Sequence, residues 1–159
     1  MDDILKLLEK DGTLTAEKLA PMLQMSAADV TAAIKKYEED KVILGYQAVI
    51  DWDRAGSDWV TALIEIKIAP QRAVGFDRIA ERIYQYEQVQ GLYLMSGAFD
   101  LTAILVDRSI RSIAEFVFAK LAPIDGVTST ATHFILKKYK DKNIMFAHEP
   151  EQEERLLFV

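Results

Sequence analysis

Apolar side chains recur at the three- and four-residue spacing of amphipathic helices through the first forty residues. They form three successive groups: Ile4, Leu7 and Leu8; Leu19, Met22 and Leu23; Val30, Ala33, Ile34 and Tyr37. Thr15 and Ser26 stand at the expected starts of the second and third helices, where a hydroxyl can cap free backbone N–H groups. The sequence therefore predicts three short helices, with an irregularity at Pro21 inside the second.

The stretch from Val42 to Ile50 has the composition of a β-ribbon, with Gly45 near its expected turn. Three short helices followed by a hairpin are the pattern of a winged helix-turn-helix DNA-binding domain. We assign that domain to residues 1–50. A small helical dimerisation module is the alternative that the same pattern allows.

The rest of the chain alternates strand and helix patterns. Residues 51–58 interrupt every periodicity and predict a linker. Residues 59–147 follow a βαββαβ order, which closes as an antiparallel sheet with two helices on one face, in a ferredoxin-like way. The predicted fold class is α+β, with a short edge strand expected at residues 143–146 and an acidic tail over residues 148–159.

A sheet of this kind has one face that its own helices do not cover. Here that face carries Leu63 together with several threonines and tyrosines. A half-apolar exposed face usually pairs with a second copy of the chain. The sequence therefore predicts a homodimer.

The turn between two of the predicted strands contains Ser96-Gly97-Ala98, and Asp100 follows it directly. A carboxylate beside a core strand is costly unless it meets a partner or caps backbone amides. Asp100 could hold the ammonium group of a bound amino acid, while backbone N–H groups near Gly97 and Ala98 take its carboxylate. It could equally tie its own hairpin turn by accepting hydrogen bonds from the backbone.

Composition and charge exclude several classes of function. A net charge of -6 argues against binding nucleic acid by bulk electrostatics, so any DNA contact must be local and helped by oligomerisation. The absence of cysteine excludes thiol chemistry, and with only His133 and His148 we expect neither a metal site nor a cofactor. No apolar run suits a membrane helix and the N-terminus lacks the basic start of a signal peptide, which predicts a cytoplasmic protein.

The ordered set of these features resembles the Lrp/AsnC family of transcription regulators, also called feast/famine regulatory proteins. The resemblance covers residues 2–146. It rests on four pieces: Ile4 to Gly12; the series Ser26, Val30, Ile34, Glu38, Val42-Ile43 and Gly45-Tyr46; Gly97-x-x-Asp100-Leu101; and Gly126-Val127 before a threonine-rich strand. It implies a DNA-binding regulator that oligomerises and is controlled by a small-molecule effector, an amino acid, bound where dimers meet.

The resemblance also assigns residues to two sites. The third helix would enter double-stranded DNA, with contacts from Ser26, Asp29, Thr31, Lys35 and Lys36. The effector would lie at the strand turn, against Ser96, Gly97, Ala98, Phe99, Asp100, Thr130 and Thr132. For the two threonines, ordinary strand composition is the competing explanation.

Three departures from the family pattern bear on these assignments. Ala33 stands where an arginine is common, and Lys35 and Lys36 are the only bases between Ser26 and Asp40, which weakens the expected phosphate contacts. Tyr37 replaces a common leucine. Phe99 replaces a common tyrosine, so the family's ligand identity cannot be carried over.

Two other functions remain as alternatives. One is a non-enzymatic sensor that oligomerises with weak or no DNA binding, favoured by the acidic first domain. The other is an enzyme, since relatives of this lineage decarboxylate a tetrapyrrole with histidines and arginines of the sheet domain. Here His133 is the only histidine in that domain and no nucleophile–base pair is visible, so we expect no enzyme.

Overall fold

A computed structural model describes residues 3–69 and 75–146 of the chain. By its internal contacts the chain divides into two compact units, of which the first holds residues 1–50 together with 140–145. Residues 51–139 belong to the second unit. The expected acidic tail at residues 148–159, with His148, lies outside the described residues.

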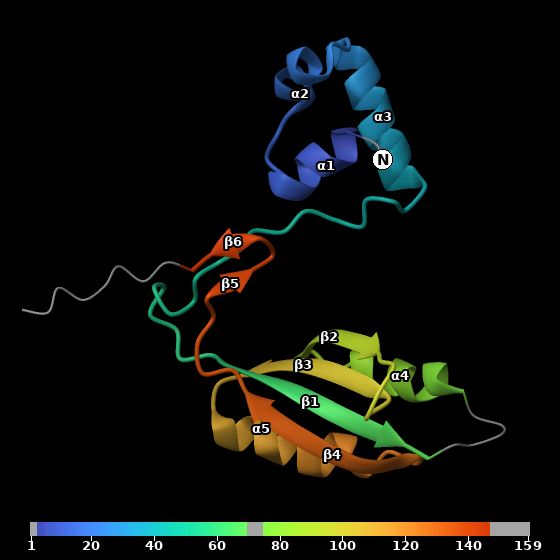
Figure 1. The fold of residues 1–159 in the computed structure, drawn as a ribbon, viewed down its shortest axis with the longest axis vertical. Coiled ribbons are helices and arrows are strands. Elements are labelled where there is room, and N and C mark those ends of the chain that lie inside the picture. The colour runs from blue at the N-terminus through green and yellow to red at the C-terminus, as the bar shows by residue number, and fades with distance from the viewer. Residues whose placement is uncertain (1–2, 70–74, 147–159) are drawn as a thin grey trace, which may run out of the picture. The chain divides into compact units, whose positions relative to one another are not determined.

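The first unit contains the three predicted helices: α1 (Asp3–Lys10), α2 (Ala16–Leu23) and α3 (Ala27–Glu39) (Figure 1). Their inward faces meet in a small core of Ile4, Leu8, Leu19, Ala20 and Val30. These residues belong to the groups that the apolar spacing marked, apart from Ala20.

The turn between α2 and α3 is built by backbone geometry. Gln24 adopts the left-handed conformation with φ 54°, and the N–H groups of Gln24 and Met25 both donate to the carbonyl of Ala20. The irregularity expected at Pro21 is not found, because α2 continues through it to Leu23. Proline lacks an N–H group, but its ring is exposed and the helix ends within one turn, so the cost stays local.

The predicted β-ribbon at residues 42–50 is wrong, since this segment forms no strand. A tight hairpin needs a residue with positive φ at its turn, and Gly45 does not adopt one. The N–H groups of Val42 and Ile43 instead donate to the carbonyl of Tyr37, at 2.8 and 3.0 Å. Ile43 then packs against the helical core, so the segment is held by α3 and not by itself.

A β-hairpin does belong to the first unit, but residues 140–145 supply it. Strand β5 (Lys140–Asp141) pairs with β6 (Ile144–Met145) in a separate two-stranded sheet, so the predicted edge strand at 143–146 does not join the main sheet. Lys142 and Asn143 both have positive φ, as the two central residues of a type I′ turn require. The Lys142 ammonium group donates to Gln47 Oε1 at 2.7 Å, which ties the hairpin to the segment at residues 42–50.

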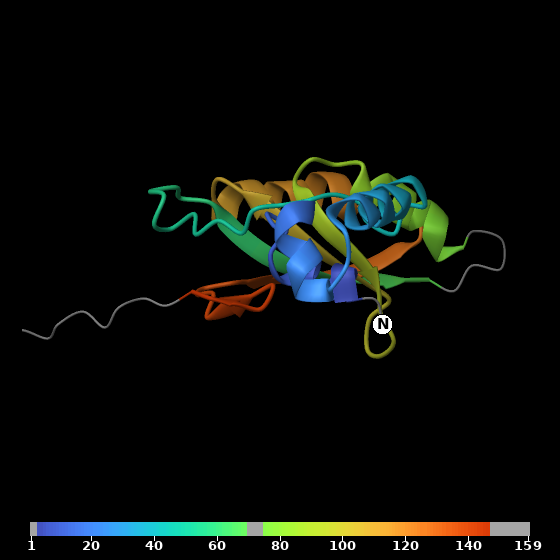
Figure 2. The ribbon, with the colours of Figure 1, turned by 90° about the horizontal axis from the view of Figure 1, so that it is seen from above.

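The second unit confirms the predicted βαββαβ order. Its elements are β1 (Val60–Ile68), α4 (Phe76–Tyr84), β2 (Val89–Leu94), β3 (Leu101–Asp107), α5 (Ile110–Phe116), the π-helical turn η1 (Val117–Leu121) and β4 (Val127–Phe134). The strands form an antiparallel sheet in the order β2-β3-β1-β4, and α4 and α5 lie on one side of it (Figures 1 and 2). Ahead of the sheet, residues 52–56 form turns within the predicted linker at 51–58.

The core of the second unit lies between the sheet and its helices. Ile64 and Ile66 of β1 and Leu105 of β3 are almost fully buried there, as are Ile83 of α4 and Ile113 of α5. Each such side chain contributes about 1.5–3 kcal/mol by leaving water. The intervening positions of β1 point to the other face of the sheet, which no described element of this unit covers.

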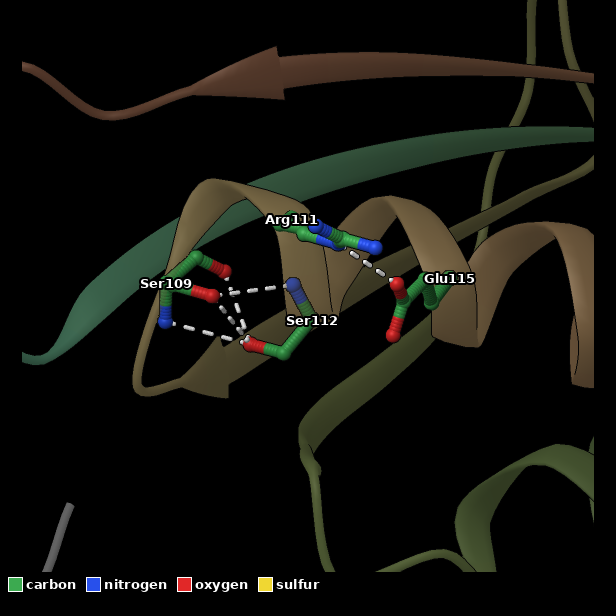
Figure 3. A network of polar contacts seen from close by, with 4 residues as sticks. All are labelled: Ser109, Arg111, Ser112 and Glu115. Carbon is green, nitrogen blue, oxygen red and sulfur yellow. Dashed lines mark hydrogen bonds and ion pairs between the residues drawn. The ribbon is translucent and has the colours of Figure 1, made fainter.

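A capping box fixes the start of α5 (Figure 3). The Ser112 N–H donates to Ser109 Oγ at 3.0 Å, and the Ser109 N–H donates to Ser112 Oγ at 3.1 Å. These reciprocal bonds satisfy two backbone donors that a helix start leaves free. Arg111, in the same first turn, pairs with Glu115 one turn further along at 2.8 Å, and both side chains are exposed.

Candidate functional site

The start of α3 carries three of the predicted DNA-contacting residues, and each makes a local hydrogen bond. Ser26 Oγ accepts from the Asp29 N–H at 3.1 Å and donates to Asp29 Oδ2 at 2.6 Å. Thr31 Oγ1 donates to the Ala27 carbonyl at 2.8 Å. All three predicted side chains are exposed, so these bonds hold the helix end without hiding it.

The two lysines of α3 are exposed one turn further along. Lys35 lies 3.7 Å from Glu39, and both side chains are mostly in solvent, so this pair is weak. Lys36 forms no ion pair with any residue that the structure describes. The helix therefore offers two cations to an anionic surface, next to carboxylates at Glu38 and Glu39.

Ala33 lies on the inner side of α3, where it packs against the core of Leu19 and Val30. Val30 is completely buried, and Ala33, Ile34 and Tyr37 are partly buried. The base of an arginine side chain at position 33 would therefore lie at the inner edge of the helix. The phosphate contacts available to this chain come from the exposed lysines.

Tyr46 and Glu38 form a contact that the sequence did not predict. The Tyr46 hydroxyl donates to Glu38 Oε1 at 3.0 Å, which fastens the segment after α3 to the last turn of that helix. Tyr46 is exposed overall, but partial desolvation and, next, the hydrogen bond to the negatively charged Glu38 raise its pKa above the ordinary value of 10.0. Gly12 leaves room for the ring, since a Cβ there would lie 3.3 Å from Tyr46 Cδ1.

The second predicted site is the loop between β2 and β3, where Ser96, Gly97 and Ala98 are exposed. Gly97 has φ 140°, a conformation that disfavours any side chain. The Met95 N–H donates to the Asp100 carbonyl at 2.8 Å and closes the loop.

Asp100 ties this loop to the end of β1. Its Oδ2 accepts from the Ile68 N–H at 2.7 Å, and its own N–H donates to the Ile66 carbonyl at 3.0 Å. The Asp100 carboxylate therefore bonds beyond its own hairpin turn, and it does so with only one of its two oxygens. Its second oxygen, Oδ1, forms no hydrogen bond with the described residues. One carboxylate can therefore both anchor the loop and accept a donor from outside.

Thr130 and Thr132 lie on β4, separated from β3 by β1. They pair with Ile66 and Ile64, whose side chains are buried beneath the helices. Residues paired directly across strands point to the same face, so both threonines point toward the helices and are partly buried. Within one chain, the structure does not bring their hydroxyls to the exposed loop.

A β-bulge accounts for Thr128. The register between β1 and β4 shifts between Lys67 and Ile68, and the Thr128 hydroxyl donates to the Lys67 carbonyl at 3.2 Å. This threonine has a structural role at the bulge.

His133 is exposed and lies 3.3 Å from Glu65 across the face of the sheet that faces away from α4 and α5. Among the residues that the structure describes, no group of three or more His, Cys, Asp or Glu is placed to hold a metal ion. In the same part of the chain, no helix is long and apolar enough to cross a membrane.

A helix-turn-helix unit followed by a βαββαβ unit defines a class of two-part regulators with a DNA-binding and a ligand-binding part. Residues 61–145 match the family model of the Lrp/AsnC ligand-binding domain. The chain belongs to the Lrp/AsnC family.

Curated relatives extend this similarity over most of the chain. The uncharacterized HTH-type transcriptional regulator YugG of Bacillus subtilis is 43% identical over 145 residues, covering 91% of this chain and 87% of that protein. The HTH-type transcriptional regulator LrpA of Pyrococcus horikoshii is 31% identical over 137 residues, covering 86% and 94%.

Solved structures show the same fold. AsnC of E. coli matches with a TM-score of 0.71 at 20% identity, over 91% of this chain and 97% of that one. A feast or famine regulatory protein from M. tuberculosis, solved in complex with L-methionine, matches with a TM-score of 0.72 at 22% identity, over 87% and 90%.

Proposed function

We propose that this protein is a DNA-binding transcription regulator whose activity a small-molecule effector, an amino acid, controls. The observation that carries the proposal is α3, which buries its apolar side in the first unit and leaves its polar side exposed. A helix held in this way after a tight turn can enter the major groove of DNA. That the curated relatives are named HTH-type transcriptional regulators supports the proposal.

In this proposal residues 1–50 bind DNA, residues 51–58 link, and residues 59–147 sense and oligomerise. Residues 140–145 group with the first unit, so in this proposal the β5–β6 hairpin acts with the DNA-binding part although it falls inside the range 59–147. Ser26, Asp29 and Thr31 present polar atoms to the bases, and the lysines of α3 contact phosphates.

DNA selection tests this part directly. Incubating the protein with fragmented genomic DNA at low salt and sequencing the bound fraction is expected to enrich near-palindromic sites, with half-sites about one helical turn apart. Recovery of no fragment above background at low salt would contradict the proposal and favour a sensor without DNA binding.

For the effector, we propose the loop between β2 and β3. A free amino acid carries one cation and one anion, so it needs an acceptor for its ammonium group and donors for its carboxylate. Asp100 Oδ1 is such an acceptor, and the exposed backbone of Ser96, Gly97 and Ala98 supplies donors nearby. The relative solved with L-methionine supports an amino acid as the ligand class. Thr130 and Thr132 join this site only if another copy brings them there.

A thermal-shift screen with the twenty amino acids tests the effector. We expect at least one to raise the melting temperature, and Asp100→Asn to abolish that rise, because the amide cannot balance an ammonium charge. An unchanged melting temperature with all twenty would contradict the effector proposal.

We also propose that the protein forms a homodimer through the sheet face opposite α4 and α5. Leu63 and Ile104 are partly buried on that face, beside the Glu65–His133 pair. A half-apolar face of this kind suits a second copy.

We further propose that the protein is not an enzyme. Turnover of a tetrapyrrole substrate by the purified protein would contradict the non-enzymatic assignment.

A further inference from the structure

An open groove of about 450 Å³ lies between the C-terminal part of α4 and the end of η1. It is lined by Arg82, Gln85 and Tyr86 from the end of α4 and just after it, and by Lys120, Pro123 and Ile124 from the end of η1 and just after it. Sites for small metabolites span roughly 300–1,000 Å³. The groove is thus large enough for one, and it is separate from the loop that holds Asp100.

The lining of the groove is positively charged in an acidic protein. Arg82 and Lys120 both line the groove and are exposed, and neither forms an ion pair within the part of the chain that the structure describes. No carboxylate is among the described lining residues. Two like charges that border one groove repel each other, and an anion bound there removes that repulsion.

A purely structural role explains each cation only in part. Arg82 lies in the last turn of α4 and Lys120 in the last turn of η1, where a positive charge complements the helix C-terminus. A cation on any side of those helix ends would interact with the C-terminus equally well. This interaction does not explain why both border one groove, together with the amide of Gln85.

The apolar part of the lining is held in place by the core. The Tyr86 ring packs edge-on against buried Phe116, with ring centres 5.1 Å apart and planes at 90°. Ile124 is 8% exposed, and its N–H donates to the Leu121 carbonyl at 3.1 Å. The groove therefore combines two cations with an apolar part that contacts the core.

The backbone beside the groove is unusual. Ala122 N–H donates to the Val117 carbonyl at 2.8 Å, which closes a π-helical turn over Val117–Leu121. Such turns are rare and occur frequently at functional sites. The turn over Val117–Leu121 carries Lys120, and its π-helical geometry is independent of the groove's shape and charge.

We propose that this groove is a second small-molecule site, which takes a compact dianion with an apolar body. Arg82 and Lys120 hold the charged group, Gln85 donates to it, and the apolar part lies on Tyr86 and Ile124. A phosphate monoester and a dicarboxylate share this chemistry. The site differs from the proposed amino-acid site in requiring no acceptor for an ammonium group.

Titration of the isotope-labelled full-length protein, followed by amide NMR and calorimetry, tests the proposal with three probes: AMP, glutarate and inorganic phosphate. AMP or glutarate is expected to bind at least about tenfold more tightly than inorganic phosphate, because the apolar part of the lining adds to the charge. Which of the two binds identifies the charged group as phosphate or dicarboxylate.

Variants separate the groove from general charge. Arg82→Gln and Lys120→Gln are each expected to weaken binding at least about tenfold, since each removes a charge-assisted hydrogen bond. Arg82→Lys keeps the charge and is expected to retain binding within a few-fold. Arg111→Gln, an exposed arginine of α5 that pairs with Glu115, is the matched control and is expected to bind as the wild type does.

Three results would overturn the proposal. They are no saturable binding of AMP or glutarate at about 10 mM, binding no tighter than that of inorganic phosphate, and binding that Arg82→Gln and Lys120→Gln leave unchanged. Asp100→Asn is expected to leave AMP and glutarate binding intact, so failure at the amino-acid site and failure at this groove are distinguishable.

Discussion

At the scale of single residues, Asp100 combines an anchoring and a binding capacity in one carboxylate. Oδ2 accepts from Ile68 at 2.7 Å and joins the loop to β1, while Oδ1 makes no hydrogen bond with the described residues. Replacing Asp100 with alanine removes both functions, whereas asparagine keeps an acceptor for the Ile68 N–H.

We therefore expect Asp100→Ala to lower the free energy of unfolding by about 1–3 kcal/mol, and Asp100→Asn to lower it clearly less. Urea unfolding followed by circular dichroism measures both. Equal losses for the two variants would show that the negative charge, and not the acceptor, holds the loop.

A second residue-scale prediction concerns Tyr46 and pH. Its pKa is raised above 10.0 in the folded protein, so the unfolded chain loses the hydroxyl proton first as the pH increases. The stabilisation that Tyr46 contributes through this shift is therefore complete below pH 10, and it is lost as the pH rises from there through the pKa of the folded state.

The stability difference between the wild type and Tyr46→Phe is expected to shrink above that pH. Urea titrations of both proteins at neutral pH and on either side of the tyrosine titration would show it. A difference that stays constant across the titration would contradict the hydrogen bond to Glu38.

At the scale of elements, α3 depends on its first turn. Ser26 accepts from the Asp29 N–H, and alanine at this position leaves that donor without its partner. Ser26→Ala is expected to destabilise the first unit by about 1 kcal/mol. Ser129→Ala, on an exposed position of β4, is the matched control with little expected effect. Thermal unfolding of both variants checks this, and equal melting temperatures would argue against the cap.

Elements that depend on neighbouring residues could be predicted from the sequence, and those that depend on distant ones could not. The helices and the strands of the sheet follow from apolar spacing and caps such as Ser26. The ribbon at 42–50 was predicted wrongly because Gly45 keeps a negative φ. The hairpin that the first unit has instead, at residues 140–145, makes its turn at Lys142 and Asn143. This pair lacks the glycine that usually marks such a turn.

The candidate site shows the same limit. Asp100 was found from its charge within an apolar stretch, but its partner, Ile68, lies 32 residues earlier in the chain. The groove beside Lys120 had no sequence signal, because its cations are distant in sequence and its π-turn has no recognisable pattern. The sequence did identify the family, since the ordered set of short motifs spans nearly the whole chain.

At the scale of the whole molecule, the exposed sheet face is proposed to join two copies. Leu63→Lys places a charge in the middle of this face and is expected to shift the protein from dimer to monomer. Phe118→Lys, an equally drastic change at an exposed position of η1, is expected to leave the dimer intact. Sedimentation velocity distinguishes the species, and a dimer that persists in Leu63→Lys would place the interface elsewhere.

The central claim is that α3 binds DNA, and the salt dependence of that binding tests it most directly. Fluorescence anisotropy on a selected genomic fragment, measured over a range of salt, gives the slope of log affinity against log salt. Lys35→Gln and Lys36→Gln together are expected to weaken binding and to reduce that slope by about 0.9 for each phosphate that a lysine no longer neutralises. Arg111→Gln, in the second unit, is expected to change neither. An unchanged slope in the double variant would contradict the account.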